Sequence, residues 1–195
     1  IENLDLGINV AGMVGHTAVR YYVMGERSVE EMATDEEIAQ MAEIVGVSMD
    51  AGAVGFSTNR YPPHVGPDGR SIPGTYAAAK ELIEIAKVVG EKKGLMQNVL
   101  DFGGEPDFSR QLLKDLAATT KERILFSMAA GPDKGSGKRL CNMIDELCSD
   151  GGDITAISMP RSSGFMFGLQ SSLPFSGETW DAIRKLNLDG RLSAI

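Results

Sequence analysis

Two histidines and a few carboxylates supply the groups with which this chain could do acid–base chemistry. His16 directly follows one apolar run, and Asp101 follows another, so each should lie where a buried strand ends. A histidine or a carboxylate in that position can move a proton to or from a bound substrate. We therefore predict His16 and Asp101 as catalytic residues. For His16 a structural role, in which the ring fixes the turn by hydrogen bonding to backbone, is the alternative.

Three other side chains could hold a small polar substrate, namely Tyr61, Asn98 and Arg161. Asn98 and Arg161 stand near the ends of predicted strands, and an arginine can grip a carboxylate through two hydrogen bonds. Arg20 has the same capacity, and for either arginine a surface position or an ion pair is the alternative. Tyr61 precedes two prolines in a long polar loop, where it could project into the mouth of the sheet or pack on the prolines. His64 lies in the same loop, either as an exposed surface residue or as a lid residue that faces substrate.

Metal and nucleotide motifs are missing from the sequence. It contains no HxH, HExxH or CxxC pair, so these residues do not include the ligands of a conventional zinc site. The glycine-rich segment 131–139 resembles a phosphate-binding loop. However, Pro132 replaces a required glycine, and Arg139 replaces the serine or threonine that holds magnesium. We therefore predict no nucleotide binding and interpret the segment as a turn at a helix N-terminus.

Five short apolar runs, with amphipathic segments between them, must position these groups. Thr34 and Glu37 form a capping box before the first long helix, and Thr75 should cap the helix that follows the loop 59–74. Strands that alternate with helices indicate parallel βαβ units, which build either an open doubly wound sheet or a closed barrel. The predicted strands are 8–15, 53–57, 95–100, 124–128 and 154–159, and the predicted helices are 17–24, 34–52, 75–94, 107–120 and 136–149.

The overall composition excludes several partners. A net charge of -8 argues against nucleic acid and anionic membranes, and no apolar run approaches the roughly 20 residues that span a bilayer. Cys141 and Cys148 lie two turns apart on a predicted helix, too far for a disulfide, so we expect reduced thiols and a cytoplasmic protein. The expected partner is a small-molecule substrate, and a homo-oligomer is compatible with the sequence.

Several unusual motifs occur in the order found in one enzyme family. They are Asn9–Arg20 with Met24-Gly25 after it, Asp50–Thr58, Tyr61-Pro62-Pro63 and Pro73-Gly74-Thr75. In these segments the chain resembles the N-acyl-D-amino-acid deacylases, the D-aminoacylase-like branch of the metal-dependent amidohydrolase superfamily. The resemblance implies an α/β fold, a partial (β/α)8 TIM-type barrel. Residues 1–195 would form a single domain of it, the middle portion of a larger amidohydrolase domain.

The resemblance also implies hydrolysis of a non-peptide C–N bond, in an N-acyl amino acid or a related linear or cyclic amide. In the family a zinc-bound water attacks the amide carbonyl, and a tyrosine at the position of Tyr61 holds the substrate. Two metal-binding histidines of the family correspond here to Val99 and Met128, neither of which is a good zinc ligand. Zinc is thus compatible with the full-length protein but is not supported by this segment. Two hypotheses follow: an amidohydrolase that draws on ligands outside the segment, and a catalytically degenerate barrel that binds a small molecule or acts as a subunit.

Overall fold

The computed structural model describes residues 7–131, 133–158, 168–170, 173 and 177–195. Contacts group the chain into two compact units, residues 1–158 and 159–195. The first contains the sheet and carries the candidate site.

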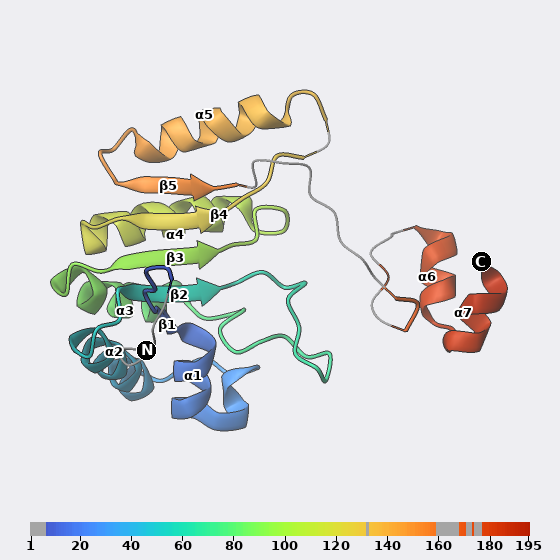
Figure 1. The fold of residues 1–195 in the computed structure, drawn as a ribbon, viewed down its shortest axis with the longest axis horizontal. Coiled ribbons are helices and arrows are strands. Elements are labelled where there is room, and N and C mark those ends of the chain that lie inside the picture. The colour runs from blue at the N-terminus through green and yellow to red at the C-terminus, as the bar shows by residue number, and fades with distance from the viewer. Residues whose placement is uncertain (1–6, 132, 159–167, 171–172, 174–176) are drawn as a thin grey trace. The chain divides into compact units, whose positions relative to one another are not determined.

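The first unit is built on a sheet of five parallel strands (Figure 1). The strand order is β1-β2-β3-β4-β5, so each strand pairs with its neighbours in the sequence. A doubly wound sheet reverses its strand order at a switch point, and no reversal occurs here. The order is that of a barrel wall, which resolves the alternative that the sequence left open. The strands are β1 (Val14–Gly15), β2 (Gly55–Asn59), β3 (Leu95–Val99), β4 (Ile124–Ser127) and β5 (Ile154–Ile157).

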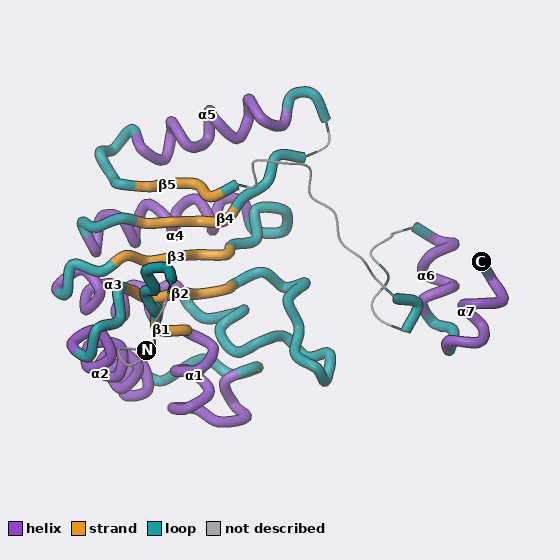
Figure 2. Tube along the Cα trace, in the orientation of Figure 1, coloured by secondary structure: helices purple, strands orange, loops and turns teal. Residues whose placement is uncertain are grey.

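Helices connect successive strands and form a layer beside the sheet (Figure 2). Helix α2 contacts α3, and α3 contacts α4, so the helices of successive connections are neighbours. The predicted capping box is confirmed at the start of α2, because Thr34 Oγ1 accepts from the Glu37 N–H at 3.2 Å and the Glu37 carboxylate accepts from the Thr34 N–H at 2.8 Å. The helices are α1 (His16–Met24), the short 3-10 helix η1 (Gly25–Ser28), α2 (Asp35–Asp50), α3 (Ala79–Glu91), α4 (Pro106–Thr120) and α5 (Ser136–Cys148).

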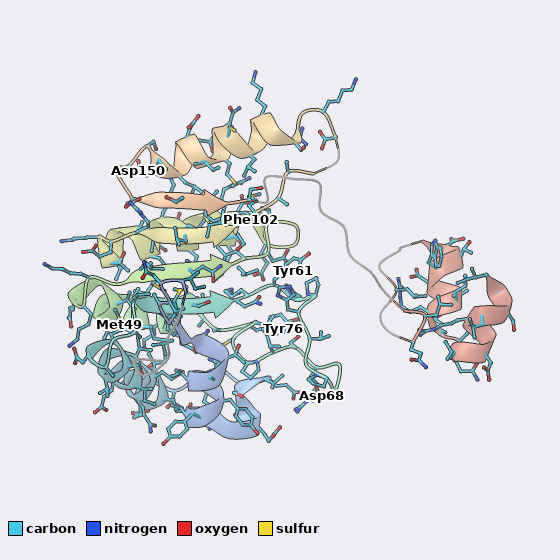
Figure 3. All side chains as sticks on the ribbon, viewed as in Figure 1. Met49, Tyr61, Asp68, Tyr76, Phe102 and Asp150 are labelled. Atoms are coloured by element: carbon cyan, nitrogen blue, oxygen red, sulfur yellow. The ribbon has the colours of Figure 1, made fainter. Side chains whose placement is uncertain are left out.

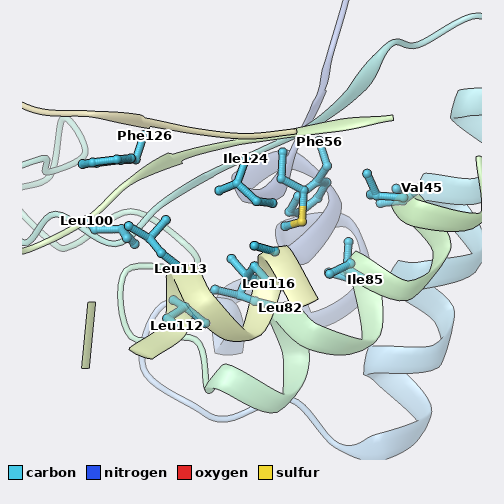
Figure 4. Packing of buried hydrophobic residues seen from close by; sticks show 14 of the residues in the cluster. Val45, Phe56, Leu82, Ile85, Leu100, Leu112, Leu113, Leu116, Ile124 and Phe126 are labelled. Atoms are coloured by element: carbon cyan, nitrogen blue, oxygen red, sulfur yellow. The ribbon is translucent and has the colours of Figure 1, made fainter. Parts of the chain in front are cut away.

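One face of the sheet packs on the helices to form the core (Figure 4). Side chains alternate between the two faces of a strand, and in β2, β3 and β4 alternate residues are fully buried. The apolar members of this buried face include Phe56, Met96, Ile124 and Phe126. The residues between them are half-buried and form the opposite face, which in a barrel wall is the interior face.

Two elements begin later than the sequence predicted. The apolar run from residue 8 is not a strand until Val14, because only Val14 and Gly15 pair with β2, and Ile8 is 76% exposed. Thr75 does not cap the following helix. Its hydroxyl donates to Ile72 O within a turn at 2.9 Å, and the helix begins at Ala79.

The second unit contains α6 (Glu178–Arg184) and α7 (Leu188–Ala194). Asn187 caps α7 by accepting from the Gly190 N–H at 2.9 Å. Within the ranges that the structure describes, no helix has the length and apolar character needed to cross a membrane.

Candidate functional site at the carboxyl ends of the strands

The carboxyl ends of the parallel strands lie along one edge of the sheet. The register aligns Asn59, Val99, Ser127 and Ile157 in one row across β2, β3, β4 and β5. Tyr61 follows β2 at this edge, at the end of the sheet opposite Met49 (Figure 3). Parallel α/β proteins bind their ligands at this edge, so it is where the candidate groups must be examined.

His16, the first residue of α1, is enclosed rather than exposed at this edge. Its side chain is 1% exposed, Nδ1 lies 2.8 Å from Thr58 Oγ1, and Nε2 lies 2.6 Å from Glu81 Oε1. The ring also packs against Phe56, with ring centroids 5.4 Å apart. Because both ring nitrogens are engaged, the geometry supports a structural role for His16. The ring bonds to side chains, however, and not to the backbone as that alternative supposed. This geometry gives no support to the predicted catalytic role.

Glu81 of α3 also binds a second buried side chain, Arg20. The Arg20 guanidinium is 2% exposed, and it donates to Glu81 Oε2 through Nη1 and to Ser28 O through Nε at 2.9 Å. Burial by itself would raise the pKa of Glu81, but the hydrogen bonds and charges of His16 and Arg20 outweigh burial and hold that pKa below its usual value. The folded protein therefore keeps an ionised carboxylate in its interior. We call His16, Arg20, Thr58 and Glu81 the buried network.

The buried network also fixes the β2–α3 loop (residues 60–78), which contains the predicted substrate-binding tyrosine. Thr58, which contacts the His16 ring, lies in β2 two residues before the loop. Near the other end of the loop, Thr17 Oγ1 donates to Pro73 O at 3.0 Å. Gly74 lies so close to the His16 ring that a Cβ atom there would be 2.7 Å from Nδ1. Thus one buried ring holds the loop near its start and near its end.

Arg60 connects the same loop to the next one. Its side chain is 7% exposed, donates to Ala77 O, pairs with Glu105 at 3.3 Å and lies over the Phe108 ring at 4.5 Å. Burial lowers the pKa of Arg60, and the Glu105 carboxylate partly offsets this effect. The beginning of the β2–α3 loop is therefore packed against the start of α4.

Three side chains around the first turn of the loop form a connected group. Tyr61 N–H donates to Asn59 Oδ1 at 2.9 Å, and Asn59 Nδ2 lies 2.6 Å from His64 Nδ1. The rings of Tyr61 and His64 meet edge to face, with centroids 5.1 Å apart. The tyrosine is 37% exposed, and the histidine is also exposed. We call Asn59, Tyr61 and His64 the rim triad. It contains Tyr61 as the sequence predicted, together with the histidine whose role the sequence left open.

The interior face of the sheet carries a short hydrogen-bonded chain. Ser57 Oγ donates to Gln97 Oε1 at 2.9 Å, and Gln97 Nε2 donates to Ser127 Oγ at 3.2 Å. These residues come from three neighbouring strands and are half-buried. The chain therefore gives the interior face polar groups next to the row of strand ends.

Two other predicted site residues, Asn98 and Asp101, make hydrogen bonds within the protein. Asn98 is fully buried on the face that packs on the helices, where it donates to Leu125 O at 3.1 Å, so this placement does not support substrate contact. Asp101 lies after β3, but its Oδ1 accepts from the N–H groups of Gly103 and Gly104, at 3.1 Å and 2.8 Å. Arg161 lies outside the described residues. Of the predicted residues, Tyr61 is the one that the described geometry presents at the rim.

Asp101 offers a direct test of its local role. Replacing Asp101 by alanine should lower the free energy of unfolding by about 1–2 kcal/mol, because two backbone N–H groups lose their acceptor. Replacing it by asparagine keeps that oxygen and should cost much less. Denaturant unfolding of the two variants makes the comparison. Equal losses would contradict the turn-forming role, and loss of turnover in the asparagine variant without loss of stability would support the predicted catalytic one.

Comparison with known proteins identifies relatives of the chain. No protein-family model matches it. D-aminoacylase of Alcaligenes xylosoxydans xylosoxydans is 33% identical over 98 residues, which cover 50% of this chain and 18% of that protein. The structure of N-acyl-D-glutamate deacylase from Bordetella bronchiseptica is similar, with a TM-score of 0.60 at 26% identity over 76% of this chain and 30% of its own. The resemblance to the D-aminoacylases is confirmed.

A D-aminoacylase crystal structure, described as defining a novel subset of amidohydrolases, supports the same fold. It gives a TM-score of 0.63 at 22% identity over 79% of this chain and 31% of its own. The predicted fold class, α/β with part of a TIM-type barrel, is therefore confirmed. The chain spans less than a fifth of the curated D-aminoacylase, at 18%, and about a third of the solved structures.

The structures of two relatives contain metal. N-acyl-D-glutamate deacylase was solved with zinc, and D-aminoacylase has a binuclear metal center. Among the described residues of this chain, no three His, Cys, Asp or Glu side chains are placed to hold a metal ion. The row of strand ends presents Val99 and Ile157, and the nearby His16 is fully engaged. The described residues thus do not fit a zinc site.

Sequence reasoning missed the residues that organise this site. Glu81 stands in the Glu81-Leu82 segment, which also resembles the deacylase family. Nothing in the sequence indicates its pairing with His16 and Arg20, because a glutamate in the first turn of a helix is ordinary. In the sequence, Asn59 stands at the start of the long polar loop 59–74, but its hydrogen bonds depend on how the following turn folds. A preference of asparagine for bonding to backbone two residues on is the signal that could have identified it.

Proposed function

We propose that this chain forms part of the catalytic barrel of an amidohydrolase that cleaves a C–N bond in an N-acyl amino acid or a related amide. The observation that carries the proposal is the rim triad, which lies at the carboxyl end of a strand in a barrel wall related to D-aminoacylase. Because the chain covers a minor part of its relatives, the activity belongs to the full-length protein.

The described residues have a binding and orienting part in this reaction. The aromatic ring of Tyr61 and the polar edge of His64 would cover a bound amide, and the polar chain Ser57–Gln97–Ser127 would face it from the barrel wall. We assign no bond-breaking step to these groups. Zinc, as a cofactor of the full-length protein, would need ligands from outside the described residues.

A second candidate function is a degenerate barrel that binds a small molecule or acts as a subunit. Val99 and Ile157 favour it, because apolar side chains occupy strand ends where a metallohydrolase needs ligands. Both candidates take a small molecule as partner. The net charge of -8 supports neither nucleic acid nor an anionic membrane as partner. A cytoplasmic location and a homo-oligomer remain part of the proposal.

The experiment that separates the candidates uses the full-length protein. It would be incubated with N-acetyl-D-leucine, N-acetyl-D-glutamate and a hydantoin, release of amine or ring opening would be followed, and its zinc content would be measured. Hydrolysis with stoichiometric zinc supports the amidohydrolase. Binding of these compounds without any turnover supports the degenerate barrel, and neither binding nor turnover contradicts both.

A further inference from the structure

The orientation of the Asn59 amide is fixed by its backbone neighbour. The N–H of Tyr61 can only donate, and it lies 2.9 Å from one end of the amide, so that end is the oxygen Oδ1. The other end, Nδ2, is a donor and faces His64 Nδ1 at 2.6 Å. Since a donor faces Nδ1, this ring nitrogen must be the acceptor. Asn59 therefore selects one tautomer of the neutral His64 ring, with the proton on Nε2.

The same contacts fix the direction of the His64 ring. His64 N–H donates to Tyr61 O at 3.0 Å, which closes a tight turn, and the two rings pack edge to face at an interplanar angle of 81°. Within the described ranges no hydrogen bond engages Nε2. The β2–α3 loop that carries the ring is held at both ends, by the buried network and by Arg60.

We propose that His64, held in its Nε2–H tautomer by Asn59, donates a hydrogen bond to a substrate oxygen, and that Tyr61 packs beside the same ligand. A fixed neutral N–H donor recognises acceptor oxygens, so the group recognised is the carboxylate or the acyl carbonyl of an N-acyl amino acid. This inference rests on the proposed function and assigns to His64 a role in recognition. The test must therefore report on binding and on turnover separately.

The first measurement is nitrogen-15 NMR of the histidine rings in the full-length protein. Wild-type protein should show His64 as the Nε2–H tautomer. Replacing Asn59 by aspartate keeps the acceptor for the Tyr61 N–H but turns the donor that faces Nδ1 into an acceptor, so the proton should move to Nδ1. Titration with N-acetyl-D-leucine should shift the Nε2 signal of the wild type. An Nδ1–H tautomer in the wild type, or no shift at saturating ligand, overturns the proposal.

The second measurement compares dissociation constants for N-acetyl-D-leucine. The substitution His64→Leu should weaken binding by about tenfold or more, as expected for a lost hydrogen bond to a charged or polar group. His64→Gln, whose amide keeps a donor near the place of Nε2, should recover part of that loss. Val65→Ala, an exposed neighbour in the same loop, is the matched control and should bind like the wild type.

The outcomes distinguish this inference from the proposed function. Turnover with unchanged binding in His64→Leu overturns the role of His64 and leaves the amidohydrolase in place. If ligand binding depends on His64 but no turnover occurs, the recognition role of His64 is supported and the proposed amidohydrolase activity is contradicted. If the full-length protein neither binds nor hydrolyses N-acetyl-D-leucine, N-acetyl-D-glutamate or a hydantoin, both the role of His64 and the amidohydrolase are overturned.

Discussion

Replacing Glu81 by glutamine should lower the free energy of unfolding by about 3–5 kcal/mol, because it leaves the buried Arg20 cation without its counter-charge. Glu81 is 1% exposed and Arg20 is 2% exposed, so water cannot take the place of the lost carboxylate. Glutamine keeps one carbonyl oxygen, but it replaces the other carboxylate oxygen by an NH2 group that cannot accept. Either His16 or Arg20 therefore loses the oxygen to which it donates.

Glu84, three residues further on the same helix, is the matched control. It pairs with Lys87 at 2.7 Å, and both side chains are well exposed, at 37% and 53%. Replacing Glu84 by glutamine should change stability by less than about 0.5 kcal/mol. Urea unfolding of both variants gives the two values. A loss at position 81 no larger than at position 84 would show that the buried network does not stabilise the fold.

The Glu81 carboxylate also makes the free energy of unfolding depend on pH. The pKa of Glu81 in the folded protein lies below its usual value, because the hydrogen bonds and charges of His16 and Arg20 outweigh burial. Its contribution is therefore complete above the pKa of a free glutamate, about 4.3, and is lost as the pH falls through the folded value. The wild type should lose stability on acidification below about pH 4.3 more steeply than the Glu81→Gln variant. Parallel pH profiles of the two proteins would contradict the assignment.

The fold was largely predictable because its signals are local. Apolar runs and helical periodicity identify β2 to β5 and their helices, and a capping box identifies the start of α2 at Thr34. The choice between a doubly wound sheet and a barrel was not predictable, because both give the same alternation of elements and differ in strand order alone. Thr75 was misassigned as a cap, since its hydroxyl bonds within a preceding turn instead.

The site was less predictable because side-chain direction and long-range pairing decide it. His16 was placed at the correct strand end, but its partner Glu81 is 65 residues away in the sequence. Asn98 was chosen by its position near a strand end. However, Asn98 is two residues from Met96 on the same strand, and side chains two residues apart point to the same face. Both side chains therefore point toward the helices. The alternation of side chains along the strand, starting from the apolar Met96, would have placed Asn98 on the buried face.

Replacing Gly74 by alanine should destabilise the protein and displace the β2–α3 loop. Gly74 has a φ angle of +98°, a conformation that costs an L-residue about 1–3 kcal/mol. The new Cβ would also lie 2.7 Å from His16 Nδ1, and crowding of this kind costs about 1–3 kcal/mol more. The ring cannot move aside freely, because Thr58 and Glu81 hold both of its nitrogens.

Gly69 in the same loop separates the two costs. Its φ angle is +81°, but a Cβ atom there would meet nothing within 4 Å, so Gly69→Ala carries the backbone strain without the contact. The difference in unfolding free energy between the two alanine variants therefore measures the contact of the loop with the His16 ring. If the rim triad recognises substrate, Gly74→Ala should also weaken binding of N-acetyl-D-leucine more than Gly69→Ala does, since it moves the anchor of the loop that carries Tyr61 and His64. Equal stability losses in the two variants would mean that the His16 ring does not restrain the loop.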